Sequence, residues 1–412
     1  MTYKPTELLN VYLDARKQRH KVGRLALKDR QILFEYDRAF IASGIEISPI
    51  KLPLCPGVVI PDATIYEGLF GVFNDSLPDG WGRLLLDRTV ETQGIHRRQL
   101  NPLDRLAYVG RHGMGALSYE PELSIPSSAE AVVSLDKLAE ESAIVLDGEG
   151  EEVFDELLRL NGSSAGARPK IVAQVSADKK RIIHGQQSLQ GGFTHWMIKF
   201  PSSQDAGDMG AIEYGYSLMA RSAGVVMPDT HLFRTKKNKY FGTKRFDRDG
   251  DTRIHMHSLG GLLHVDHRTP SLDYDAVLSV TFGLTRNILD VEKVYALACF
   301  NVLAHNRDDH VKNFSFLLNA NQEWIFAPAY DLVFSYGPGG EQSMLVMHKG
   351  KNPGTAELHD LGKKHNLKAA PDILARVQRA VRRWPEYAKK ASVSPKSTRD
   401  IARTINGPAA VC

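Results

Sequence analysis

Residues 305–314 read His305-Asn306-Arg307-Asp308-Asp309-His310-Val311-Lys312-Asn313-Phe314. This polar stretch follows a run with helical apolar spacing at 291–304 and precedes a strand-like run at 314–318. It contains an Arg-Asp pair, with an asparagine five positions after the aspartate. In phosphoryl transfer an aspartate accepts the proton of the attacking hydroxyl, and an asparagine one loop further offers its amide oxygen to magnesium. We therefore predict that Asp308 is a general base and that Asn313 is a metal ligand.

A third carboxylate, Asp331, follows in Pro328-Ala329-Tyr330-Asp331-Leu332. It comes after the next pair of strand-like runs and is the candidate ligand that links magnesium to the phosphates. The order of base, asparagine and metal aspartate is the order of protein kinases. Two alternatives stay open, a solvated polar turn and a metal-hydrolase site, although no further His/Asp motif at metal-ligand spacing accompanies the second. The hydrolase site would use His305, Asp309 and His310.

Phosphoryl transfer also requires a cation and a loop of small residues at the nucleotide phosphates. Lys199 ends the predicted strand 195–200, where it is either that cation or a surface lysine. The segment 162–170 reads Gly162-Ser163-Ser164-Ala165-Gly166-Ala167-Arg168-Pro169-Lys170, which is rich in small residues and ends in a base. Its backbone can approach phosphates closely, and an ordinary turn is the alternative.

Two other clusters suggest chemistry that we disfavour. The run Gly110-Arg111-His112-Gly113-Met114-Gly115 has the wrong glycine order for a dinucleotide site, and no helix of adequate length follows it. The group His255, His257 and His264 is more typical of satisfied or exposed histidines than of a metal site.

The composition is that of an ordinary globular protein. Apolar residues make up 42% and charged residues 24% of the 412 residues, which predicts two or three compact units. The chain has 52 Lys and Arg against 48 Asp and Glu, a formal net charge of +4. No run approaches the ~18 apolar residues of a membrane span, and the start lacks the apolar core of a signal peptide, so we expect a cytoplasmic protein. Three widely separated cysteines exclude a disulfide scaffold.

Charge and element patterns divide the chain. Residues 1–120 predict a mixed α/β unit, in which Asp79 is a candidate helix cap, and residues 121–150 predict a linker with one short helix. Short strands and one helix between 170 and 246 predict a small antiparallel sheet, and helices dominate from about residue 273. Residues 136–156 contain nine acids and one lysine, whereas residues 363–403 contain twelve Lys or Arg and three acids.

Together these motifs resemble the HipA family of serine/threonine kinases, the toxins of bacterial toxin–antitoxin pairs. The family's leading domain is similar to Phe73-Asn74-Asp75-Ser76-Leu77-Pro78-Asp79-Gly80 with Arg83. Its Ser-x-Ala-Gly-Ala-x-x-Lys element is similar to residues 163–170, and its catalytic loop is similar to Asp308-x-His310-x-Lys312-Asn313-Phe314-Ser315. The resemblance implies an α+β, bilobal protein-kinase-like fold, with a small antiparallel-sheet lobe and a large, mainly helical lobe, after a mixed α/β amino-terminal domain.

Four parts follow from this resemblance. They are a HipA-type amino-terminal domain (1–125), an acidic linker (126–150), a small lobe with phosphate loop and hinge (151–247), and a helical lobe with a basic carboxy-terminal helix (248–412). ATP and Mg²⁺ are the implied cofactors, a small DNA-binding, HipB-like antitoxin is the implied partner, and the implied substrate is a protein with a target serine or threonine.

The resemblance also implies residue roles: Asp308 as catalytic base, Asn313 and Asp331 as magnesium ligands, and Lys199 on the ATP phosphates. Phosphorylation of Ser163 is the implied event that expels the loop and switches the kinase off, because it adds roughly −1.5 to −2 charge beside the nucleotide's own phosphates. Ser164 stands where an apolar residue is usual and is the alternative phosphosite. The backbone of 244–246 is the implied adenine hinge, with Lys244 in place of the acid often found there. The implied nucleotide-binding residues are Ala165, Gly166, Ala167, Arg168, Pro169, Lys170, Lys199, Lys244, Arg245, Phe246, His310, Val311, Lys312, Asn313 and Asp331.

A second interpretation treats the chain as a catalytically weak partner of a DNA-binding antitoxin, acting as a transcriptional co-repressor. Its basis is a predicted helix over 372–391, whose apolar stripe consists of Ile373, Val377, Ala380, Val381 and Trp384. Arg379 and Arg382 lie away from this stripe and are the candidate contacts to DNA phosphates. A solvated amphipathic helix that covers the larger lobe is the alternative.

Overall fold

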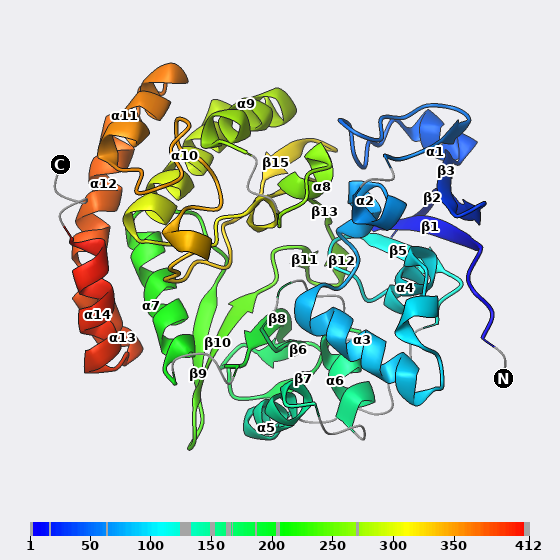
Figure 1. Ribbon diagram of the computed structural model, residues 1–412, viewed down its shortest axis with the longest axis horizontal. Coiled ribbons are helices and arrows are strands. Elements are labelled where there is room, and N and C mark those ends of the chain that lie inside the picture. The colour runs from blue at the N-terminus through cyan, green and yellow to red at the C-terminus, as the bar shows by residue number, and fades with distance from the viewer. Residues whose placement is uncertain are drawn as a thin grey trace. The chain divides into compact units, whose positions relative to one another are not determined.

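The structure is a computed structural model that describes residues 3–15, 18–62, 65–123, 133–148, 153–161, 166, 168–185, 188–202, 207–268 and 272–407. Its contacts divide the chain into two compact units. Unit 1 comprises residues 1–205, 233–264 and 317–322, and unit 2 comprises residues 206–232, 265–316 and 323–412. Figure 1 labels the elements of both units.

Unit 1 begins with a five-stranded sheet in the order β4-β3-β2-β1-β5, whose strands pair antiparallel. The short apolar runs at 22–27 and 31–36 predict a hairpin, which is confirmed as β2 and β3. Strand β1 alternates between core and outer face, with Leu9, Val11 and Leu13 buried, as a half-buried strand requires. The strands are β1 (Leu8–Ala15), β2 (Gln18–Lys28), β3 (Gln31–Tyr36), β4 (Val58–Val59) and β5 (Leu117–Glu120). The helices are α1 (Arg38–Ser43), η1 (Tyr66–Gly68), α2 (Gly71–Asn74), α3 (Gly80–Thr92), η2 (Arg97–Gln99) and α4 (Pro102–Val109).

The second sheet of unit 1 has the order β7-β6-β8-β10-β9, and the predicted small antiparallel sheet is confirmed. Its strands are β6 (Lys170–Ser176), β7 (Ile182–His184), β8 (Phe193–Lys199), β9 (Thr230–Arg234) and β10 (Lys239–Lys244). Only the last two residues of β9 belong to unit 1. After the sheet come β11 (Arg248–Asp249), β12 (Thr252–Arg253), β13 (His255–Ser258) and α8 (Leu259–Leu263).

The acidic region expected as a linker contains a packed helix, α5 (Leu135–Leu146), followed by α6 (Phe154–Asn161). Leu135, Leu138 and Val145 recur at helical spacing and are buried in one apolar cluster with the second sheet. Ser134 caps the first turn by accepting a hydrogen bond from the amide of Lys137. This acidic helix is therefore a packed element: Glu140 is exposed, but Glu141 is buried and Asp136 accepts hydrogen bonds from Thr235 and Tyr240.

Unit 2 is mainly helical. The predicted helix over 291–304 is α10, whose residues from Val294 to Leu303 are all buried. The elements of this unit are α7 (Met209–Ser222), α9 (Tyr274–Thr285), α10 (Ile288–Leu303), η4 (Val311–Asn313), β14 (Ser315–Leu318, which crosses the unit boundary), β15 (Trp324–Phe326), η5 (Pro338–Gly340), α11 (Thr355–Lys364), α12 (Ala370–Arg382), α13 (Trp384–Ala391) and α14 (Pro395–Ile405). Helices α9 and α12 pack on α10, and α13 packs on α7 (Figure 1).

The prediction of one continuous helix over 372–391 is wrong, because α12 ends at Arg382 and α13 begins at Trp384. Pro385 lies in the first turn of α13, where its missing N–H is tolerated at a helix start but would interrupt a continuous helix. The predicted apolar stripe is confirmed, since all five of its residues are buried. No helix in the described residues combines the length and the apolar character that crossing a membrane requires.

Candidate active site

The predicted site residues fall in both units, and each part is described by itself. Unit 2 contains Asp308, His310, Val311, Lys312, Asn313 and Asp331. Unit 1 contains Gly166, Arg168, Pro169, Lys170, Lys199, Lys244, Arg245 and Phe246. The predicted phosphosites Ser163 and Ser164, and the loop residues Ala165 and Ala167, lie outside the described residues.

The catalytic-loop segment of unit 2 leaves α10 through a sharp turn. His305 has a φ of 53°, and the next residue, Asn306, is bonded twice to Asn301 in the last turns of the helix. The Asn306 amide donates to the Asn301 carbonyl at 2.9 Å, and its side-chain nitrogen donates to Asn301 Oδ1 at 2.9 Å. Both asparagines are buried, so this pair fixes the direction in which the loop leaves the helix.

Asp308 is the exposed residue of this loop, with 57% of its side chain accessible, while Arg307 and Asp309 on either side of it are buried. His310 Nε2 lies 3.7 Å from Asp308 Oδ1. The side-chain nitrogen of Asn313 donates to the Asp308 carbonyl at 2.7 Å. The structure therefore brings the predicted base and the predicted metal ligand into contact. This contact uses the side-chain nitrogen of Asn313 and not its amide oxygen.

Tyr330 connects the Asp331 segment to the same loop. Its hydroxyl donates to the Lys312 carbonyl at 2.6 Å and lies 2.6 Å from Ser315 Oγ. Asp331 itself has a φ of 56°, in the left-handed region that aspartate tolerates better than most residues and that is frequent at functional sites. Tyr330 was not predicted from the sequence; its only signal is its position directly before Asp331.

These oxygen donors suit magnesium. Mg²⁺ is usually bound by one or two carboxylates together with substrate phosphates, rather than by a cage of protein ligands. Asp331 supplies a carboxylate and Asn313 an amide oxygen whose nitrogen is already used. Among the residues that the structure describes, no three His, Cys, Asp or Glu side chains are grouped so as to hold a metal ion, which gives the alternative hydrolase site of His305, Asp309 and His310 no support.

In unit 1, two lysines lie opposite each other on neighbouring strands. Lys170 of β6 pairs with Lys199 of β8, so both side chains leave the same face of the sheet. On the other side, Lys199 pairs with Phe241 of β10, and its Nζ lies 5.8 Å from the centre of that ring. The Pro169 carbonyl accepts the Phe200 amide at 2.8 Å, which fixes the start of β6 beside the end of β8. Two cations at one sheet edge can bind a polyphosphate.

Gly166, beside these lysines, is held by the start of α3. Its amide donates to the Asp79 carboxylate, and its carbonyl accepts the Trp81 amide at 3.1 Å. Asp79 occupies the predicted cap position, but no side-chain cap bond forms, because its carboxylate accepts from Gly166. Gly166 has a φ of 107°, which favours glycine, and a Cβ there would lie 2.4 Å from Lys170 Nζ, so that the lysine side chain would have to move.

The predicted hinge contains a buried ion cluster. The Arg245 amide donates to the His195 carbonyl at 2.8 Å, and its guanidinium forms two bonds to the Asp247 carboxylate at 2.9 and 2.7 Å. Arg248 adds a third at 2.8 Å. Burial alone would raise the pKa of Asp247, but the two arginines hold it well below its usual value.

The glycine run 110–115 provides backbone hydrogen-bond partners for this ion cluster. The Gly115 amide donates to Asp247 Oδ2 at 2.8 Å, and the carbonyls of Gly113 and Gly115 accept bonds from Arg248 and Arg253. A structural use therefore accounts for the glycines that suggest a dinucleotide site in the sequence.

Two of the three histidines singled out in the sequence are buried and bonded. His255 Nε2 lies 2.8 Å from the Ile47 carbonyl, and His257 bridges Asp75 Oδ2 at 2.6 Å and Ser48 Oγ at 3.0 Å. This Asp-His-Ser chain has the connectivity of a hydrolase triad, but its serine is 1% exposed. It is therefore a buried polar network rather than a reactive site.

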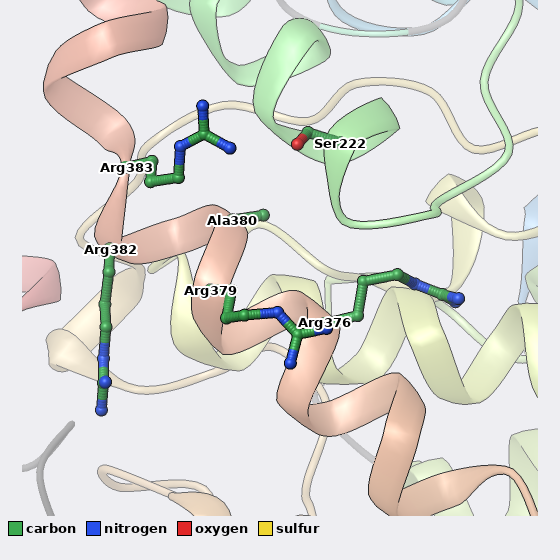
Figure 2. Close-up of a pocket in the computed structure, with 6 residues that line it drawn as sticks. All are labelled: Ser222, Arg376, Arg379, Ala380, Arg382 and Arg383. Carbon is green, nitrogen blue, oxygen red and sulfur yellow. The ribbon is translucent and has the colours of Figure 1, made fainter.

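The candidate DNA contacts, Arg379 and Arg382, line a pocket of about 410 Å³ in unit 2. The other lining residues are Ser222, Arg376, Ala380 and Arg383. Arg376 donates to the Ala223 carbonyl at 2.9 Å, and Arg383 pairs with Glu386 at 2.7 Å. Figure 2 shows the arginines spreading in different directions, with Arg382 extending away from Ser222. Four arginines therefore line this pocket, although their guanidinium groups point in different directions.

A small antiparallel sheet followed by a mainly helical region is the arrangement of kinase-like folds, and Asp308, Asn313 and Asp331 follow one another in the order that such folds use. The chain belongs to the HipA family. The model of the HipA-like C-terminal domain matches residues 162–390, and that of the HipA N-terminal domain matches residues 9–120.

Individual relatives agree with this assignment. The chain is similar to HipA of Shewanella oneidensis MR-1, seen in a crystal structure of that toxin–antitoxin system with HipB and its operator DNA. The TM-score is 0.68 at 18% identity, over 96% of this chain and 94% of that one, which shows a shared fold. This chain is also 26% identical over 152 residues to the protein named "Putative kinase Y4dM" of Sinorhizobium fredii. That match spans 34% of this chain and 37% of Y4dM.

Proposed function

We propose that this protein is an ATP- and Mg²⁺-dependent protein serine/threonine kinase that acts as the toxin of a toxin–antitoxin pair. The observation that carries the proposal is the catalytic loop, in which the exposed Asp308 is bonded through its carbonyl to Asn313, and Tyr330 ties the Asp331 segment to the same loop. Membership of the HipA family supports the toxin role.

Each residue has a distinct task in the proposed reaction. Asp308 accepts the proton of the attacking serine or threonine hydroxyl as the phosphoryl group is transferred. Lys199 and Lys170 offset the negative charge of the phosphates. Gly166, which has no side chain, lets the loop backbone and the Lys170 ammonium approach the phosphates together. Asn313 and Asp331 would hold magnesium, whose chemistry when bound is to offset negative charge on the phosphates.

The proposal includes self-inactivation. Phosphorylation of Ser163, or of Ser164, would add about −1.5 to −2 charge to the loop that binds the nucleotide phosphates. Like charges repel most strongly where water is excluded, so the modified loop would no longer close over ATP. The resemblance to the family supports this part of the proposal.

The first experiment compares the wild type with Asp308→Asn in labelled ATP and Mg²⁺, with phosphate mapped by mass spectrometry. Removing a general base should lower phosphotransfer by at least about 100-fold, while ATP affinity stays within about twofold. Asp360→Asn, an exposed carboxylate on α11, is the matched control and should behave as wild type. Equal phosphotransfer in wild type and Asp308→Asn would refute the assignment of the base.

A second function, favoured by the four-arginine pocket, is participation in a DNA-bound complex with a small HipB-like antitoxin. Arg376 and Arg383 are engaged with protein groups, whereas in the described part of the chain Arg379 and Arg382 have no ion-pair partner. Guanidinium groups of this kind bind DNA phosphates irrespective of sequence and release counterions when they do so.

The test of this second function measures binding of the chain to a 30-base-pair duplex by fluorescence anisotropy over a range of salt concentrations. Each lost phosphate contact should reduce the slope of log affinity against log salt by ~0.9, so Arg379→Glu/Arg382→Glu should weaken binding and flatten that slope. Lys389→Glu/Lys390→Glu makes the same charge change on α13 and is the matched control. Equal losses in both pairs would show a general charge effect and contradict a specific role for the pocket.

A further inference from the structure

The three residues Arg307, Asp308 and Asp309 differ sharply in exposure. Asp308 is exposed, whereas Arg307 is 8% and Asp309 0% exposed. Residues 335–352, here called the docking segment, supply most of the partners of the two buried residues. The docking segment also bonds the residue at which the loop begins, because the Ser335 amide donates to the His305 carbonyl at 2.9 Å.

Arg307 binds neutral oxygens of the docking segment. Its guanidinium donates to the carbonyls of Gly340 and Tyr336 and to Asn352 Oδ1, the last at 2.9 Å. In the opposite direction, Ser343 Oγ donates to the Arg307 carbonyl at 2.8 Å. Arg307 is therefore fixed through both its side chain and its backbone.

Asp309 is surrounded by donors. Its carboxylate accepts from Tyr274 Oη at 2.8 Å, from Gln342 Nε2 at 3.1 Å, and from the amides of Ser343 at 2.8 Å and Met344 at 3.3 Å. Three of these four donors belong to the docking segment. Two buried anchors on either side of one exposed residue leave that residue little freedom in its backbone.

We infer that Arg307 and Asp309 are positioning residues, which hold Asp308 in its reactive place by fixing the catalytic loop to the docking segment. This inference rests on the proposed kinase function and extends it to regulation. In many kinases an arginine binds a phosphate on the segment after the metal aspartate, and the phosphate orders that segment. Here carbonyl and amide oxygens already occupy the guanidinium, so the docking segment holds the base without being phosphorylated.

The experiment measures initial rates of phosphotransfer to dephosphorylated casein over a range of ATP concentrations. Arg307→Gln and Asp309→Asn should lower kcat about 10- to 100-fold, because a small displacement of a reacting group is costly. The affinity for ATP, measured by calorimetry, should change less than about twofold, since neither residue belongs to the proposed nucleotide-binding set. Arg307→Lys should recover part of the rate. Arg399→Gln and Asp400→Asn, both exposed on α14, are the matched controls.

Ser343→Ala provides a milder variant, because it removes one bond to the Arg307 carbonyl and leaves every charge in place. It should lower kcat about threefold while the melting temperature stays close to that of the wild type.

Three results would overturn the inference. The first is an unchanged kcat in Arg307→Gln and Asp309→Asn. The second is a joint fall of kcat, ATP affinity and melting temperature in these variants that Ser343→Ala reproduces. The third is a loss of activity after phosphatase treatment that only a phosphate on the docking segment restores. A wild type that binds ATP but transfers no phosphate is a different outcome, because it would refute the proposed function itself and with it the positioning role.

Discussion

Gly166 shows at the scale of one residue how a small side chain fits beside the proposed phosphate site. Its φ of 107° and the 2.4 Å between a Cβ built there and Lys170 Nζ exclude a larger residue without movement. Gly166→Ala should therefore displace either the loop or the Lys170 side chain, because alanine is strained at this backbone conformation. The displacement should raise KM for ATP about tenfold. Gly283→Ala is the matched control, because a Cβ there meets nothing within 4 Å. An unchanged KM in Gly166→Ala would contradict the proposed phosphate contact.

Asp75 is the residue for which a pH-dependent stability is expected. Burial alone would raise its pKa, but the hydrogen bond and charge of His257 and the donors of Ser258 hold the pKa below its usual value. Because a depressed carboxyl pKa stabilises the folded state above the unfolded value, this contribution is present above about pH 4 and is lost as the pH falls through the folded pKa.

Asp75→Asn should lower the free energy of unfolding at pH 7 by about 3 kcal/mol, because it removes a carboxylate that accepts hydrogen bonds from His257 and Ser258 in a buried site. Urea unfolding between pH 7 and pH 3 measures this difference, which should shrink on the acid side. Asp249→Asn, exposed on β11, is the control and should show no such trend. A difference that stays constant down to pH 3 would mean that the Asp75 charge does not contribute.

The residues that could be predicted are those that belong to a motif of short, fixed spacing along the sequence. Asp308 and Asn313 are five positions apart, and the structure joins them by a hydrogen bond. The contacts of Tyr330, Asp309 and Asp79 could not be found in this way, although the sequence singled out Asp79 as a helix cap and Asp309 as a residue of the alternative hydrolase site. Their partners lie far away in the sequence, as with Asp79 and Gly166, so the function of these side chains is created by the tertiary fold.

At the scale of elements, apolar periodicity predicted four of the five strands of the second sheet, β6, β7, β8 and β10, and helix α10 to within a few residues, because burial on one face determines them. Strand β9 was not predicted. The break between α12 and α13 was missed, since the apolar stripe continues through it and only Pro385 marks the interruption. The packed state of α5 was missed for the opposite reason. Its many acids suggested an acidic linker with one short helix, whereas three apolar residues at helical spacing determine that the helix packs.

At the scale of the whole molecule, the sequence suggests an amino-terminal domain separate from the sheet that follows, and the two family models match these regions separately. The contacts instead place both in unit 1. Buried polar groups account for this union: Asp247 accepts from the Gly115 amide, Arg253 donates to the Leu117 carbonyl, and His257 bonds Asp75. Each of these groups would lose its partner if residues 1–123 were removed, and a buried polar group without a partner costs about 1–3 kcal/mol.

We therefore expect a fragment of residues 133–412 to be insoluble or to unfold without a cooperative transition, although it contains every residue assigned to the reaction. Co-expression with a fragment of residues 1–123 should restore a soluble complex, because the contacts between the two regions are non-covalent and would re-form in trans. Calorimetry of the full chain, of the fragment and of the reconstituted pair measures this. If fragment 133–412 alone melted cooperatively at the temperature of the full chain, the buried network around Asp247 and His257 would not be what unites unit 1.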